Sequence, residues 1–408
     1  MTQPRRRPPS REAAAVIRGM ADHGSISRRS LLQGAGLAGL AAAISACGTA
    51  GAVGASGEKP APARDLSASQ KEVNWANWTL YLDYDEETRK YPSLDAFTKK
   101  TGIKATYAED VEDNDTYYGK IQGQLRNGQD MGKDIVVFTD WMAGRMIRQG
   151  YTQELDKSVI PNWENLLPNL KAVDFDPGRA HSLTWQSGFA GIAYNKKIAP
   201  VRTVDELWRP DLKGKVEVLT EMRDTIGLIM MAQGVDISSE FGTTEFGNAI
   251  DVLNKQLDQG QIRQAKGNSY KEDLISGDCL ACVAWSGDIT QINFENDDQW
   301  EFVIPESGGT LWSDNLMIPV GSPHKRNAEE LMNFYYDPVI AAEVAAYVNY
   351  ICPVEGAQDA MAQFDESLVE NPYIFPTPEE LANVHVFRAL SPTDETEFTT
   401  AFQDALGL

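Results

Sequence analysis

An aromatic ring and a carboxylate stand two residues apart near position 313, where Trp312 and Asp314 belong to a segment that opens with Gly308-Gly309 and ends at Pro319. In an extended strand, residues two apart face the same side, so the indole and the carboxylate would lie next to each other. Such a pair can bind an alkyl ammonium, because the ring attracts the cation and its methylene groups while the carboxylate neutralises the charge. The alternative is a strand end with a half-buried Trp312 and a solvated Asp314.

A second acidic pair, Glu221 and Asp224, follows the expected strand at residues 215–219. Residues three apart at a helix start can face one direction, although they can also simply complement the helix dipole. Aromatic residues recur at similar places after expected strands: Trp78, Tyr81, Trp141, Trp285, Trp312 and Tyr350. Each one alone is compatible with core packing. Several in parallel positions favour a ligand site, because ligands bind beyond the carboxyl ends of strands in open parallel sheets.

These side chains would be positioned by an alternation of strands and helices. Residues 134–138, Asp-Ile-Val-Val-Phe, contain a continuous apolar run that predicts a buried strand, and apolar residues at helical spacing predict helices at 115–127 and 246–257. Thr220 is the expected N-cap of a further helix that reaches about residue 231. The alternation predicts an α/β fold with a largely parallel sheet.

Motifs of catalysis are missing from the sequence. None of the three His residues that follow the N-terminal region, His181, His324 and His385, lies in an H-E-x-x-H or beside a nucleophile elbow. A secreted hydrolase that uses paired carboxylates is the alternative from the enzymes. The adjacent Tyr335-Tyr336 could suggest an iron site, but they end an amphipathic helix, which favours core packing. We expect a protein that is not an enzyme, with no catalytic residue, no cofactor and no metal.

The cysteines are interpreted as core residues. Cys279 and Cys282 have C-x-x-C spacing, but no second pair and no nearby His completes a zinc site. Positions three apart on a strand face opposite sides, which disfavours a disulfide between them. Whether either of them, or Cys352, takes part in a disulfide is left open by the sequence.

Length and charge exclude some classes of protein. With 408 residues, 42% of them hydrophobic, the chain can form one large or two medium domains. The net charge of -22 comes from 59 acidic and 37 basic residues, so the surface would repel nucleic acid and attract cations, or serve solubility alone. After the N-terminal region, no apolar segment is long enough to predict a membrane span.

Residues 1–46 have the composition of an export signal. An Arg-rich stretch precedes an apolar run of small residues, and Arg28-Arg29 resembles the twin-arginine signal. Residues 44–47, Ile-Ser-Ala-Cys, resemble a lipobox, in which Cys47 becomes the lipid-modified first residue. Residues 47–71 are rich in Gly, Ala, Ser and Pro and are expected to form a flexible tether. We expect export and lipid anchoring at the outer face of the cytoplasmic membrane, in the periplasm or at the cell surface.

Several segments spread over the chain match a single family: residues 77–81, 134–139, 191–195, 207–214, 219–221, 284–287 and 308–319. Through them the chain resembles, over roughly residues 72–355, the spermidine/putrescine-binding proteins of bacterial ABC importers. That family has the α/β periplasmic-binding-protein type II fold, with two lobes and a ligand cleft between them.

The resemblance also implies boundaries and site residues. Lobe one would comprise residues 72–187 and 314–357, and lobe two residues 190–311 and 361–408, with crossings near 187–190, 311–314 and 358–361. The implied ligand-binding residues are Trp78, Thr79, Tyr81, Thr139, Trp141, Glu221, Asp224, Trp285, Trp312, Asp314 and Tyr350.

The function that the resemblance implies is capture of a polyamine, spermidine or putrescine, and its delivery to an ABC permease and the ATPase subunits of that permease. We expect a monomer with no nucleic-acid partner. The alternative within the class is a binding protein for another cationic or zwitterionic solute, such as an amino acid derivative. Leu80 stands where the family's polyamine binders often have Glu, and Asp83 or Asp140 could replace that carboxylate. Matching the family near Glu221 requires a one-residue gap.

Overall fold

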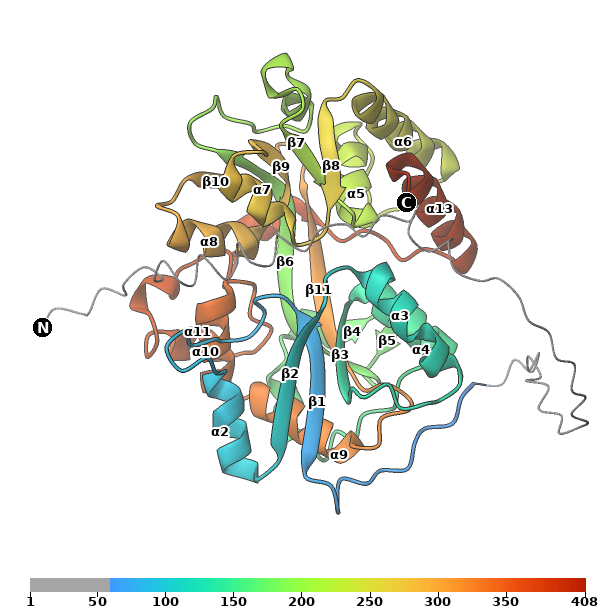
Figure 1. The fold of residues 1–408 in the computed structure, drawn as a ribbon, viewed down its shortest axis with the longest axis vertical. Helices are drawn as coiled ribbons and strands as arrows, with labels where there is room; N and C mark the ends of the chain where they lie inside the picture. Colours follow the sequence, from blue (N-terminus) through green and yellow to red (C-terminus); the bar gives the residue numbers. More distant parts are fainter. Residues whose placement is uncertain (1–58) are drawn as a thin grey trace, which may run out of the picture. The chain divides into compact units, whose positions relative to one another are not determined.

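A sheet of ten strands runs through residues 59–408, the part of the chain that the computed structural model describes (Figure 1). Its spatial order is β2-β1-β3-β11-β6-β9-β7-β8, with β10 beside β6 and β12 beside β11. The strands are β1 (Glu72–Trp78), β2 (Lys104–Val111), β3 (Ile135–Thr139), β6 (Ser182–Asn195), β7 (Val216–Leu219), β8 (Ile262–Lys266), β9 (Ala281–Trp285), β10 (Trp300–Val303), β11 (Gly309–Met317) and β12 (Val384–His385). A separate small sheet contains β4 (Ala172–Val173) and β5 (Asp176–Pro177).

The sheet is mixed, and the prediction of a largely parallel sheet is wrong. β1 pairs in parallel with β2 and β3, and β7 pairs in parallel with β8 and β9. Between these two groups, the long strands β6 and β11 run antiparallel to each other, and each runs antiparallel to its flanking strand, β9 or β3 (Figure 1). β10 and β11 follow each other along β6 and both pair antiparallel with it, so the sheet cannot be parallel throughout.

The segments between the strands form helices that pack against the sheet (Figure 1). They are α2 (Pro92–Thr101), α3 (Asn114–Arg126), α4 (Asp140–Gln149), α5 (Met222–Ala232), α6 (Thr243–Asp258), α7 (Tyr270–Ser276), α8 (Ser286–Glu295), α9 (Lys325–Tyr335), α10 (Pro338–Val348), α11 (Ala357–Met361), α12 (Pro378–Leu381) and α13 (Pro392–Leu406). The N-cap of α5 is Glu221 and not Thr220 as expected, because the Glu221 carboxylate accepts a hydrogen bond from the Arg223 backbone N–H.

Two hydrophobic cores lie along this sheet. The first is built from β1, β3, α2, α3, α4, α9 and α10, together with the start of β6 and the end of β11. The second is built from β7, β9, α5, α6 and α13, together with the remainder of β6. Met361, Leu368 and Ile374 belong to the first core, although the resemblance assigns residues 361–408 to the second lobe. The exact lobe boundaries stay a prediction.

β6 is buried along its whole length because it passes from one core to the other. Near its midpoint, Gly188 allows the ring of Trp312 on β11 to lie against the backbone. A Cβ atom at position 188 would come within 2.5 Å of Trp312 Cζ2 and 2.8 Å of Tyr350 Cδ1. Glycine is therefore required here for a close approach and not for a turn.

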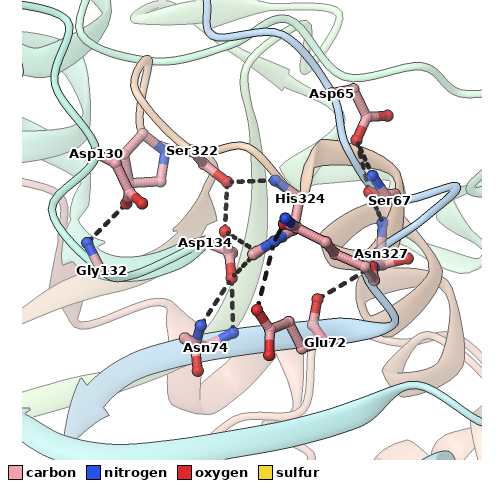
Figure 2. Close-up of polar contacts among 12 residues, drawn as sticks. Asp65, Ser67, Glu72, Asn74, Asp130, Gly132, Asp134, Ser322, His324 and Asn327 are labelled. Carbon is pink, nitrogen blue, oxygen red and sulfur yellow. Dashed lines mark hydrogen bonds and ion pairs between the residues drawn. The ribbon is translucent and has the colours of Figure 1, made fainter.

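The segment before β1 is fixed to the start of α9. The Asn327 side chain donates from Nδ2 to the carbonyl oxygens of Gln70 and Glu72 at 2.7 and 2.8 Å, and the Asn327 backbone N–H donates to Ser67 Oγ (Figure 2). The end of the expected tether over residues 47–71 is thus hydrogen-bonded to α9. The flexible tether stays a prediction, and its part before residue 59 lies outside the described residues. The partner that fixes the segment is more than 250 positions away in the sequence, so local composition could not reveal it.

A buried carboxylate joins the same region to the sheet. Asp134 Oδ1 accepts a hydrogen bond from Ser322 Oγ at 2.6 Å, and Oδ2 accepts one from the Asn74 backbone at 2.8 Å (Figure 2). His324 Nδ1 lies 3.1 Å from both carboxylate oxygens. These contacts join the amino ends of β1 and β3 to the segment that precedes α9.

The three described cysteines and the Tyr335-Tyr336 pair lie in the protein interior. Cys279, Cys282 and Cys352 are free and buried. Tyr335 and Tyr336 are core residues, as predicted, and their hydroxyls bond to Ser93 and to the Thr184 carbonyl. Within residues 59–408 there is no cluster of ligating side chains suited to a metal ion. No helix of that part has the length and apolar character needed to cross a membrane.

Candidate functional site

A cavity of about 530 Å³ opens where the carboxyl ends of β1, β3, β7 and β9 approach β11. In an open α/β sheet this edge is where ligands bind. The structure brings all of the predicted ligand-binding residues into the lining of this cavity: Trp78, Thr79, Tyr81, Thr139, Trp141, Glu221, Asp224, Trp285, Trp312, Asp314 and Tyr350. Their roles in binding stay predictions, but their common location does not depend on the resemblance.

Asp314 is a buried carboxylate on β11 that receives hydrogen bonds only from neutral donors. The Tyr81 hydroxyl donates to Oδ2 at 3.0 Å, and the Thr139 hydroxyl donates to Oδ1 at 2.8 Å. Burial raises the pKa of Asp314 to about 7, although the bonds from Thr139 and Tyr81 act in the opposite direction. The ionised form lacks a cation within ion-pair distance among the described residues, and it would be favoured by a cation placed in the cavity.

Asp224, in the first turn of α5, is the second buried carboxylate of this kind. It accepts a hydrogen bond from the Thr310 hydroxyl at 2.5 Å and one from Trp285 Nε1 at 2.8 Å. Burial raises the pKa of Asp224 to about 6. Since Thr310 and Asp314 both belong to β11, the two carboxylates lie on either side of Trp312.

Aromatic rings separate these two carboxylates. The Trp312 ring makes edge contacts with Trp285 and Tyr350 at centroid distances of 6.5 and 5.4 Å, and Tyr350 makes another with Tyr81 at 5.4 Å. The rings give the cavity an apolar wall with electron-rich faces. Such a wall suits methylene groups next to a cation.

Glu221 is held in a network of its own at another side of the cavity. Its carboxylate accepts hydrogen bonds from Asn114 Nδ2 and Trp141 Nε1, both at 3.2 Å. Burial raises the pKa of Glu221 to about 8, although the neighbouring Arg223 guanidinium acts in the opposite direction. The Arg223 Nη1 atom lies 3.9 Å from Glu221 Oε1.

Trp141 lines the cavity, but cationic side chains already cover its ring. The guanidinium carbons of Arg223 and Arg145 lie 4.1 and 4.8 Å from the ring centroid. We therefore expect Trp141 to position Glu221 and Arg223 instead of stacking on a ligand.

Asn114, Arg223 and Asp288 are among the polar residues of the cavity that the sequence analysis did not find. Asp288 accepts a hydrogen bond from the Tyr350 hydroxyl at 3.0 Å. The sequence does contain a pattern that indicates Asp288. This residue follows Trp285 by three positions and lies in the first turn of α8, as Asp224 lies in the first turn of α5. Asn114 and Arg223 carry no comparable signal in the sequence.

Neither proposed replacement for the carboxylate at position 80 is free in the structure. Asp83 does not line the cavity, and its oxygens accept hydrogen bonds from the backbone and hydroxyl of Ser93. Asp140 lines the cavity but accepts a hydrogen bond from Asn315 Nδ2 at 2.7 Å. Leu80 itself has a positive φ of 58°.

Comparison with known proteins gives the family. Residues 93–374 match the family described as bacterial extracellular solute-binding protein. The chain belongs to this family. Its members are solute-binding transport proteins and not enzymes, so the hydrolase alternative is not supported.

Relatives of this solute-binding protein include two named for polyamines. The chain is 27% identical over 313 residues to the spermidine/putrescine-binding periplasmic protein 1 of Haemophilus influenzae, covering 76% of this chain and 84% of that protein. It is 27% identical over 357 residues to the putrescine-binding periplasmic protein PotF of Escherichia coli, covering 83% and 92%. A solved structure described as a putative spermidine/putrescine ABC transporter from Listeria monocytogenes has a TM-score of 0.71 and 25% identity, covering 82% of this chain and 99% of that one. These relatives match the two-lobed periplasmic-binding-protein fold of the chain.

Proposed function

We propose that this solute-binding protein captures a polyamine outside the cytoplasmic membrane and delivers it to an ABC permease. The observation that supports this proposal best is the arrangement of Asp224 and Asp314 on either side of Trp312 in one buried cavity. The names of the relatives, which refer to spermidine and putrescine, point to the same class of solute.

The chemistry of the cavity suits alkyl ammonium groups. Moving an ammonium out of water costs several kcal/mol unless a carboxylate replaces the solvent. Asp224 and Asp314 are 3% and 4% exposed and would provide that replacement, while the Trp312 ring covers methylene groups. A bound cation would in turn lower the pKa of both carboxyl groups, which burial raises in its absence.

Closure around the ligand follows from the same energetics. Polar contacts join the two sides of the cavity, among them the bond from Thr220 Oγ1 to Asp113 at 2.9 Å and the bond from Gln291 Nε2 to the Leu80 carbonyl at 3.2 Å. Closing an empty cavity would bury carboxylates without a counterion, whereas a cationic ligand removes that penalty. Ligand binding would therefore favour the closed arrangement, which a permease could distinguish from an open one.

The export route belongs to the proposal as well. Twin-arginine export, lipid attachment at Cys47 and action as a monomer are inferred from the sequence, and residues 1–58 lie outside the described residues. Mass spectrometry of the membrane fraction tests the anchor: an acylated Cys47 at the mature N-terminus is expected, and a mature chain with another first residue would contradict it.

Isothermal titration calorimetry of the purified protein tests the proposed solute. Putrescine, spermidine and a panel of amino acids, including Arg and Lys, would be titrated under the same conditions. We expect a polyamine to bind with a dissociation constant well below millimolar and more tightly than any amino acid. The proposal fails if no polyamine binds more tightly than about 1 mM, a standard free energy of about -4.1 kcal/mol. Tighter binding of an amino acid would favour the zwitterionic alternative.

A further inference from the structure

One cavity carboxylate already has a counterion from the protein itself. Lys271 on α7 places Nζ 3.1 Å from Asp288 Oδ1. The hydroxyls of Tyr350 and Tyr270 complete the shell of this carboxylate, donating to Oδ1 and Oδ2 at 3.0 Å each. Lys271 and Asp288 are 8% and 3% exposed, so their ion pair is shielded from solvent.

Glu221 is compensated in a similar way by Arg223. The guanidinium lies 3.9 Å from Glu221 Oε1 and 3.8 Å from Glu395 Oε1, and it stacks on Trp141. Lys271 and Arg223 thus neutralise the carboxylates of Asp288 and Glu221, which could otherwise bind a cationic ligand.

The remaining carboxylates of the cavity fall into two groups. Glu112 and Asp174 are exposed at its mouth, where water solvates them. Asp113 receives a hydrogen bond from Thr220, and Asp140 receives one from Asn315, whose Oδ1 accepts a hydrogen bond from Arg179. Asp224 and Asp314 are then the buried pair that faces Trp312 without a cation of its own among the described residues.

Asp224 and Asp314 are linked through β11. Asp224 is bonded to Thr310, which is four residues before Asp314 on β11, a distance of roughly 13 Å along a strand. Two carboxylates without a protein cation match the two ammonium groups of a linear diamine, whereas spermidine carries three ammonium groups.

We propose that the site selects a linear diamine over a triamine, and that Lys271 determines this selectivity by occupying Asp288 in place of a third ligand ammonium. This inference rests on the proposed function. A triamine would bring a third positive charge into a cavity whose third carboxylate is already neutralised, and that charge would be desolvated without compensation. Lys271 does not line the cavity, so it acts through Asp288 and need not touch the ligand.

The test compares putrescine and spermidine by calorimetry on the wild type and on variants at position 271. We expect the wild type to bind putrescine at least tenfold more tightly than spermidine. Lys271→Met leaves Asp288 without its cation and should shift the ratio at least tenfold toward spermidine. Lys271→Arg keeps the positive charge and should keep the preference for putrescine.

A double variant guards against loss of folding in Lys271→Met, since a buried carboxylate without a partner is destabilising. Lys271→Met combined with Asp288→Asn removes both charges and should keep the wild-type preference for putrescine.

Tighter binding of spermidine by the wild type would overturn the diamine inference while supporting the proposed function. An unchanged ratio in folded Lys271→Met, or a preference for spermidine in the double variant, would overturn the role of Lys271. Absence of binding by both amines would instead refute the proposed function, on which the inference depends.

Discussion

Asp314 is the carboxylate on which we expect ligand affinity to depend most, because it is buried and accepts hydrogen bonds from two hydroxyls. Asp314→Asn keeps the shape but removes the charge that would face an ammonium. Calorimetry should show at least a tenfold loss of polyamine affinity, about 1.4 kcal/mol. Asp174→Asn, at the exposed mouth of the same cavity, is the matched control and should change affinity less than about twofold. Equal affinities for wild type and Asp314→Asn would remove the role assigned to this residue.

The same carboxylates predict how affinity depends on pH. Burial raises the pKa of Asp314 to about 7 and that of Asp224 to about 6 in the absence of ligand. A bound ammonium, whose own pKa is near 10, lowers both values, so the complex holds fewer protons than the free protein. Affinity should therefore fall as pH falls from about 8 to about 5, by up to tenfold per pH unit for each proton that binding releases.

Titrations at several pH values check this dependence, with Asp314→Asn as the comparison. The slope of log affinity against pH should be smaller in the variant, since one titrating group is gone. A wild-type affinity that stays constant between pH 5 and pH 8 would show that these carboxylates do not titrate on binding.

Local sequence patterns predict some neighbours in the cavity and miss others. Trp312 and Asp314 could be predicted as neighbours because strand periodicity is local. Glu221 and Asp224 could be placed near them because the ends of strands meet at one edge of the sheet. Lys271 and Asp288 could not be paired, because they lie on different helices and meet only through packing. The covering of Trp141 by two arginines is equally a product of tertiary structure.

Among the elements, α13 contributes a charged contact that joins the two cores. Glu395 in its first turn lies 2.7 Å from Arg148 and 3.2 Å from Arg145, both on α4. Phe398 and Phe402 of α13 pack in the second core, whereas α4 packs in the first. Glu395 therefore connects elements that would separate if the cavity opened.

Glu395→Gln should weaken this connection, because Arg148 loses its carboxylate partner while Arg145 keeps Asp115. We expect a loss of polyamine affinity of at least about threefold, expressed mainly as faster dissociation in stopped-flow measurements. Glu397→Gln changes an exposed residue two positions away on the same helix and should leave the dissociation rate unchanged. If both variants release ligand at the wild-type rate, α13 does not stabilise the closed arrangement.

The close approach of β6 to Trp312 gives a second prediction for an element. In Gly188→Ala, the new methyl group would meet the ring carbons of Trp312 and Tyr350 at distances well inside van der Waals contact. We expect the free energy of unfolding to fall by about 1–3 kcal/mol and polyamine affinity to fall at least tenfold, because the indole is displaced.

Chemical denaturation and calorimetry check both effects of this substitution. Gly123→Ala on α3 is the control, since a Cβ there meets no atom within 4 Å and should stabilise the helix by roughly 0.5–1 kcal/mol. Wild-type affinity in Gly188→Ala would show that the position of the Trp312 ring is not critical for binding.

The protein is expected to close its cavity when a polyamine binds. Because an empty closed cavity buries carboxylates without a counterion, ligand-free protein should favour a more open arrangement than ligand-bound protein. Small-angle X-ray scattering should show a smaller radius of gyration when a saturating polyamine is added. Asp314→Asn at the same polyamine concentration should show less of this change. An identical radius with and without ligand in the wild type would contradict ligand-dependent closure.

The paired strands β6 and β11 also have a consequence for folding cooperativity. Neither core is formed by one continuous stretch of chain, since β6 leaves the first to enter the second and β11 returns. Unfolding one core alone would remove the pairing partners of the halves of β6 and β11 in that core and expose the backbone groups of those halves. Residues 59–408 should thus melt as one cooperative unit, and neither lobe should be stable when expressed without the other.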